Sequence, residues 1–201
     1  MKKNVITFFL AVGAWIFSSQ LSAQEFPVSV GFKAATNLSN YRLSGGVEGN
    51  SKMSIGGSLG GIVKYDISPN FALQSGIDFY YRTSKLGNQT DKIKSFGVEI
   101  PLYGIVQGEL GRGKAFIGAG PYIGYGISAK SSGVSLFKPN STTGRSTMNR
   151  LDYGVGGIIG YDLGKNWQIN ATYQFGLADL KKTNGGSMKT QVTSIGLAYK
   201  F

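Results

Sequence analysis

The stretch TQVTSIGLAYKF fills residues 190–201 and ends on an aromatic residue. Side chains alternate between the two faces of an extended strand, so every second residue of this stretch shares a face. One face carries Gln191, Thr193, Ile195, Leu197, Tyr199 and Phe201. We expect such a terminal strand to pair with the first strand and close a barrel, because closure removes an exposed sheet edge.

A secretory leader is predicted at the opposite end of the chain. Lys2 and Lys3 precede an apolar run at 5–17, and small residues at 21–23 offer a cleavage site. This run is shorter than the roughly 20 apolar residues of a membrane-spanning helix. We therefore predict a signal peptide at 1–23 and one domain at 24–201, exported to the outer membrane of a Gram-negative bacterium. The alternative is an N-terminal membrane anchor.

The composition favours strands and turns over packed helices. The chain has 31 Gly in 201 residues, and 41% of it is hydrophobic, 12% aromatic and 15% charged. There is no Cys, which excludes disulfides and a lipid-modified Cys after the leader. Without the leader the chain has 19 basic and 10 acidic residues, a net charge of +9.

Eight segments alternate like strands of a membrane barrel, which need about 9 to 11 residues. We predict them at 27–36, 54–65, 71–82, 95–107, 114–128, 150–162, 167–177 and 190–201. The connections alternate between long polar segments (37–53, 83–94, 129–149, 178–189) and tight turns (66–70, 108–113, 163–166). This order predicts an all-β, eight-stranded antiparallel up-and-down transmembrane β-barrel, porin-like in architecture, with periplasmic termini.

The side chains on the two faces of the strands distinguish a membrane barrel from a soluble one. We expect Ile169 and Tyr173 to contact lipid, and Asn170 and Gln174 to face inward. A soluble barrel would instead keep its apolar face inside and show water a face rich in Lys and Glu. The polar face here is poor in charge, which favours the membrane. A soluble periplasmic ligand-binding barrel is the alternative.

An internal repeat predicts an aromatic girdle at the periplasmic end. GGIVKYDI at 60–67 recurs as GGIIGYDL at 156–163, and each copy has an aromatic before and after its turn. Good hairpin chemistry reached twice would explain the repeat equally well. The predicted girdle consists of Tyr65, Phe71, Tyr161, Trp167, Tyr199 and Phe201.

Two prolines lie inside predicted strands, where proline cannot donate a ladder hydrogen bond. Folding the chain about a turn near Gly111 brings Pro101 and Pro121 close together. We expect them to share a bulge, and to lie diagonally on opposite faces.

The residue types argue against an enzyme. The chain has no His and no Cys, so the commonest general base, metal ligand and thiol nucleophile are all missing. Known outer-membrane barrel enzymes rely on an active-site His. We predict no catalytic residue, no cofactor and no metal site.

Charged residues on the polar face form a predicted lumen network. Unpaired charges inside a narrow barrel cost several kcal/mol, so we expect pairing or hydration. A polar plug fits the narrow bore of eight strands better than an ion path or relay, which is the alternative. The predicted network consists of Asp78, Arg82, Glu99, Arg150 and Asp152.

The long connections are basic, and outward-facing cations attract lipopolysaccharide phosphates. A solvated surface without a specific ligand is the alternative reading. We expect outer-membrane lipids including lipopolysaccharide, and possible protein partners, but no nucleic acid. The basic residues are Arg42, Lys52, Lys85, Lys92, Lys94, Lys130, Lys138, Arg145, Lys181, Lys182 and Lys189.

Four motifs resemble PorT-family outer-membrane barrel proteins. They are GFKAATNLS at 31–39, VEIPL at 98–102, GPY at 120–122 and GLAYKF at 196–201. The resemblance implies a small barrel, and for the namesake a part in protein secretion. We expect a structural or binding role, with a narrow pore or a secretion accessory as the alternative. The terminal strand is the segment expected to engage the barrel-assembly machinery.

Overall fold

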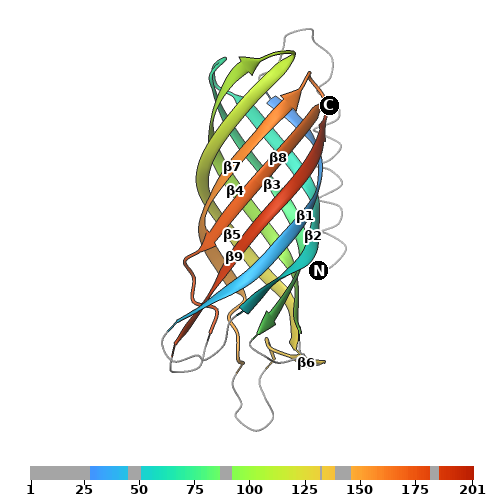
Figure 1. Cartoon of the computed structure of the whole chain (residues 1–201). Coiled ribbons are helices and arrows are strands. Elements are labelled where there is room, and N and C mark those ends of the chain that lie inside the picture. The colour runs from blue at the N-terminus through green and yellow to red at the C-terminus, as the bar shows by residue number, and fades with distance from the viewer. Residues whose placement is uncertain (1–27, 45–50, 87–91, 132, 139–145, 182–185) are drawn as a thin grey trace, which may run out of the picture.

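The computed structural model describes residues 28–44, 51–86, 92–131, 133–138, 146–181 and 186–201 (Figure 1). The predicted signal peptide lies outside these residues. None of the helices within the described ranges is long and apolar enough to cross a membrane.

The described chain forms one closed antiparallel sheet (Figure 1). Its strands are β1 (Val28–Ser44), β2 (Ser51–Asp66), β3 (Phe71–Leu86), β4 (Lys92–Leu110), β5 (Gly113–Ser131), β6 (Val134–Ser135), β7 (Leu151–Leu163), β8 (Trp167–Gly176) and β9 (Ser187–Lys200). The eight long strands each pair with their neighbours in the chain, and β6 pairs only with the end of β5. The predicted eight-stranded up-and-down barrel is therefore confirmed.

Pairing of the first and last long strands closes the barrel. The β1–β9 register runs from Gly31 opposite Lys200 to Ser44 opposite Ser187. Beyond the end of β9, the Phe201 N–H donates to the Val30 carbonyl oxygen, with N and O 2.8 Å apart. The terminal stretch thus leaves β1 no free edge along this register.

The apolar side chains face outward, as predicted. Ile169 and Tyr173 on β8 are 47% and 45% exposed, whereas Asn170 and Gln174 between them are 4% and 6% exposed. A soluble barrel would show the reverse arrangement. The wall therefore presents an apolar surface, and the bore is filled by polar side chains.

Several strands continue beyond the predicted ends, and most of the added residues lie at the end of the barrel with the long connections, hereafter the loop end. At the other end, β4 continues to Leu110 instead of residue 107. At the loop end, β1 extends to Ser44 instead of residue 36, and β4 begins at Lys92 instead of residue 95. Backbone pairing persists there, as in Lys85 opposite Lys92. The outward positions no longer need apolar side chains above the apolar band, so hydrophobic alternation fades while the ladder continues.

The opposite end, hereafter the turn end, has the three predicted tight turns. Gly111 and Gly164 lie in two of them with φ of 62° and 63°, a backbone conformation that favours glycine. The turn between β2 and β3 is closed by the Ile67 N–H, which donates to the Phe71 carbonyl oxygen.

The expected bulge at the two prolines is absent. Pro101 pairs with Tyr122, and the same register resumes at Gly104 opposite Ala119. Pro101 is buried and Pro121 exposed, so the two do lie on opposite faces. The missing proline N–H interrupts the ladder without adding a residue to it. The β4–β5 register shifts instead between Phe96 and Gly97.

Candidate functional site

Arg82 on β3 is buried among acceptors from across the bore. Its Nη2 donates to Glu99 Oε2 at 2.7 Å and to Gln174 Oε1 at 3.3 Å, and its Nη1 lies 3.9 Å from Asp152 Oδ2. Gln174 Nε2 in turn donates to Glu99 Oε1 at 2.5 Å. Two of the predicted network residues, Glu99 and Asp152, thus meet Arg82 in one cluster with Gln174, which joins β3, β4, β7 and β8.

The two aspartates of the network have further partners that the sequence did not assign. Asp152 Oδ2 accepts from the Thr190 hydroxyl at 2.8 Å, and that hydroxyl lies 3.1 Å from the Tyr122 hydroxyl. Asp78 Oδ2 pairs with Lys33 Nζ at 2.7 Å. Each predicted carboxylate in the bore therefore has a cationic or hydroxyl partner.

Arg150 does not join this cluster, in contrast to the expectation. It precedes the first residue of β7, so strand alternation does not orient its side chain. Its Nη1 donates to the carbonyl oxygens of Gly126 at 3.1 Å and Ile127 at 3.0 Å, and its guanidinium carbon lies 4.6 Å from the Phe137 ring centroid. Arg150 therefore fastens the chain before β7 to β5.

A second ionic cluster near the turn end centres on Asp162. Its Oδ2 lies 2.5 Å from Lys64 Nζ, and its Oδ1 lies 2.8 Å from Lys200 Nζ. Gln168 Nε2 also donates to Asp162 Oδ1 at 2.9 Å and to Gln74 Oε1 at 3.1 Å. This cluster ties β2, β3, β7, β8 and the last residue of β9 together.

Sequence reasoning missed the Asp162 cluster, although its signal was present. Lys64 lies between Val63 and Tyr65, which share the outward face, so alternation already places it inward. The same argument places Lys200 inward between Tyr199 and Phe201.

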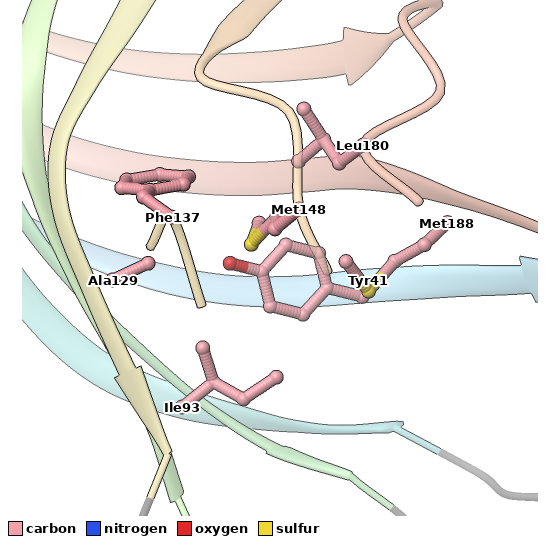
Figure 2. Close-up of a cluster of buried hydrophobic side chains, with 7 residues drawn as sticks. All are labelled: Tyr41, Ile93, Ala129, Phe137, Met148, Leu180 and Met188. Carbon is pink, nitrogen blue, oxygen red and sulfur yellow. The ribbon is translucent and has the colours of Figure 1, made fainter. Parts of the chain in front are cut away.

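Between the Arg82 cluster and the loop end, an apolar cap fills the bore (Figure 2). Strand residues and residues of the connecting segments contribute to it together. The Leu136 N–H donates to the Ala129 carbonyl oxygen and the Leu180 N–H to the Met188 carbonyl oxygen, both at 2.9 Å between N and O. The apolar cap consists of Tyr41, Ile93, Ala129, Phe137, Met148, Leu180 and Met188.

Little space remains in the bore between these clusters. A cavity of about 30 Å³ lies beside Asp78, Arg82 and Glu99, and another of about 20 Å³ separates Arg82 from the cap. Each has room for about one or two water molecules. Within the described chain, no group of three or more acidic side chains is placed to hold a metal ion. This arrangement binds the strands around the bore together.

The six girdle residues all lie at the turn end. Five of them are between 39% and 56% exposed on the outer wall. Tyr199 makes edge contacts with Trp167 at 5.0 Å and Phe201 at 5.6 Å between ring centroids. Tyr161 is less exposed, and its hydroxyl donates to the Leu110 carbonyl oxygen at 2.5 Å. Such a belt matches the amphipathic rings found at membrane interfaces.

Seven of the basic residues expected in loops lie on the strand extensions and form what we call the cationic rim. The backbone register puts basic residues directly opposite one another on neighbouring strands. The opposed pairs are Arg42 with Lys189, Lys52 with Lys85, Lys85 with Lys92, and Lys94 with Lys130. Arg145 and Lys182 lie outside the described residues, whereas Lys181 is described in the segment before β9 and Lys138 in the segment after β6.

Known structures share this architecture at low sequence identity. OprG from Pseudomonas aeruginosa is 14% identical with a TM-score of 0.51, and the match covers 87% of this chain and 95% of that one. Neisserial surface protein A is 17% identical with a TM-score of 0.49, covering 85% and 97%. Ail of Yersinia pestis in complex with sucrose octasulfate is 13% identical with a TM-score of 0.47, covering 87% and 99%. Among curated proteins, none is similar enough to match.

The family comparison agrees with the outward apolar wall. A family model described as an outer membrane protein beta-barrel domain matches residues 19–182, which is most of the chain. Together with the likeness to OprG in fold, this match makes the protein an integral protein of the outer membrane. The chain belongs to the outer membrane protein beta-barrel domain family.

Proposed function

We propose that this protein is a non-enzymatic barrel whose loop end binds the phosphate groups of lipopolysaccharide. The opposed charges of the cationic rim support this most strongly. Like charges directly opposite each other destabilise a strand pair. A bound polyanion would relieve that repulsion at several strand pairs at once.

The orientation of small outer-membrane barrels agrees with this ligand. Their short turns face the periplasm and their longer loops face the exterior. The cationic rim would then lie at the level of the outer leaflet headgroups, where a basic residue gains about 1 kcal/mol from an anionic surface. The filled bore favours binding at the rim over transport through the barrel.

A pair of charge variants tests the proposal. Lys94→Gln with Lys130→Gln removes one opposed pair, and we expect about 30-fold weaker binding of labelled lipopolysaccharide at low salt, from about 1 kcal/mol per cation. Fluorescence anisotropy on the detergent-solubilised barrel measures the Kd. Binding should also weaken as NaCl rises, because salt screens exposed charges.

The matched control removes two cations from the turn end, by Arg112→Gln with Lys165→Gln. It changes the net charge equally, so it should leave the Kd nearly unchanged if the rim is the site. Equal losses in the two double variants would indicate nonspecific attraction and contradict the proposal.

A secretion accessory of the PorT type is the second candidate, and it rests on the four motifs quoted above. One of them, VEIPL, contains Glu99 of the Arg82 cluster and Pro101 of the interrupted ladder. A deletion strain that retains lipopolysaccharide at its surface but fails to export proteins would favour this role over lipid binding.

A further inference from the structure

The outer wall of β9, β1 and β2 is hollowed where its residues are small. A hollow of about 830 Å³ opens there toward the membrane, with Ala34, Thr36 and Gly57 among its lining residues. Neighbouring side chains stand out on both sides, with Leu59 and Ile195 each 67% exposed. Short side chains between long ones leave an apolar groove in this part of the wall.

Two opposed cations lie above this hollow on the same two strands. Arg42 pairs in register with Lys189, and Thr36 with Ile195. Arg42 lies six residues beyond Thr36, on the same face and about 20 Å along the strand. The Arg42 guanidinium carbon lies 3.5 Å from the Phe175 ring centroid, outside the bore.

The local charges leave an anion site open between these two cations. Arg42 Nε is buried and has no hydrogen-bond partner among the described residues. The carboxylate of Asp179 interacts electrostatically with Lys189. It already accepts hydrogen bonds from the backbone N–H groups of Met188 and Lys181, at 2.9 and 3.0 Å. An incoming phosphate would meet two cations that the described chain does not neutralise through an ion pair.

We propose that this wall binds one phosphorylated, acylated lipid of the outer leaflet, the lipid A part of lipopolysaccharide. A phosphate would lie between Arg42 and Lys189, and an acyl chain would run down into the hollow. This inference deepens the proposed function and rests on it. It adds a fixed site on the wall to the general attraction of the cationic rim.

A second copy of the chain fits the same hollow less well. Two barrels that pack through this wall in one membrane share a two-fold axis, so each presents the same patch to the other. Arg42 and Lys189 of both copies would then lie at the same level of the membrane, where like charges repel each other. An anionic amphiphile satisfies the apolar hollow and the cations together.

The experiment is native mass spectrometry of the mature barrel released from detergent, with purified bis-phosphorylated lipid A as the probe. We expect one lipid A per barrel for the wild type. Arg42→Gln with Lys189→Gln should weaken retention at least tenfold and abolish the preference over dephosphorylated lipid A. Gly57→Val should weaken retention of both lipids several-fold by filling the hollow.

Gly57 suits this purpose because its backbone tolerates a side chain. A Cβ built there meets only the Ala35 carbonyl oxygen, at 3.4 Å. Gly61→Val is the matched control on the same strand and face outside the hollow, where the nearest atom to a Cβ is the Gly31 carbonyl oxygen at 3.8 Å. Heat-modifiable gel mobility reports folding of every variant, and Thr36→Leu serves as a second filler if Gly57→Val does not fold.

The outcomes separate this site from the proposed function. If Lys94→Gln with Lys130→Gln weakens lipopolysaccharide binding but the Arg42, Lys189 and Gly57 variants retain lipid A normally, the wall site is wrong and the rim proposal stands. If none of the variants changes binding, both are wrong. If the wild-type protein appears in the mass spectrum as a lipid-free dimer, the inference is overturned in favour of a second copy of the chain.

Discussion

Asp162 is the residue on which two buried lysines depend. Asp162→Asn leaves Lys64 and Lys200 without their carboxylate, and their side chains are only 2% and 5% exposed. Breaking a buried pair in this way costs about 3 to 5 kcal/mol. We expect a loss of that size in the free energy of unfolding, measured by urea titration of the barrel in lipid vesicles.

Asp66→Asn is the control, since Asp66 holds the equivalent place in the internal repeat. Asp66 Oδ1 accepts from Gln107 Nε2 at 2.8 Å, and an asparagine retains an acceptor there. Its effect should stay below about 1 kcal/mol, the net value of a typical hydrogen bond. Similar losses in the two variants would contradict the role assigned to Asp162.

Asp179 predicts a local pH dependence at the entry to β9. The N–H groups of Met188 and Lys181 bind its carboxylate and lower its pKa. A depressed folded pKa adds stability that is present above the unfolded pKa of about 3.9 and is lost as pH falls through the folded value. Amide exchange at Met188 should therefore lose protection below about pH 4. Asp179→Asn should remove this pH dependence, and an unchanged profile would contradict the assignment.

At the scale of elements, the β5 glycines decide whether the connecting segments fold into the bore. A Cβ on Gly126 would lie 2.5 Å from Phe137 Cζ in the apolar cap, whereas one on Gly124 meets its nearest atom at 3.5 Å. Gly126→Ala should therefore displace Phe137 and speed protease cleavage within residues 133–138 severalfold. Gly124→Ala, two residues away, should not.

Both glycine variants should still migrate as folded barrels, because the β4–β5 ladder does not depend on the cap. A Gly126→Ala barrel with wild-type protease resistance would show that the cap tolerates the shift. Loss of the whole barrel would show instead that the cap is needed for closure.

At the scale of the whole molecule, the filled bore predicts the absence of steady conductance. The Arg82 cluster and the apolar cap follow one another along the bore. The cavities beside Arg82 measure only about 30 and 20 Å³. Planar-bilayer recordings should show no steady single-channel current for the wild type. A steady current that Glu99→Gln abolishes would favour the narrow pore instead.

Much of this molecule follows from alternation along single strands. Ile169 and Tyr173 outside, with Asn170 and Gln174 inside, could be predicted because each strand spans an apolar band with a filled bore behind it. The tight turns could also be predicted from the sequence, since Gly111 and Gly164 supply the positive φ angles that they need. The ends of the strands at the loop end could not be predicted in this way, because backbone pairing continues there beyond the last residues of the apolar alternation.

The sequence by itself determined the class of fold and the outward apolar face, because these depend on residues two apart in one strand. Only the tertiary structure decided which charges meet. Arg82 joins Glu99, Lys64 joins Asp162 across 98 positions, and Arg42 stands opposite Lys189. Partners on different strands are set by the register and by closure of the barrel, and no single segment of the chain encodes either.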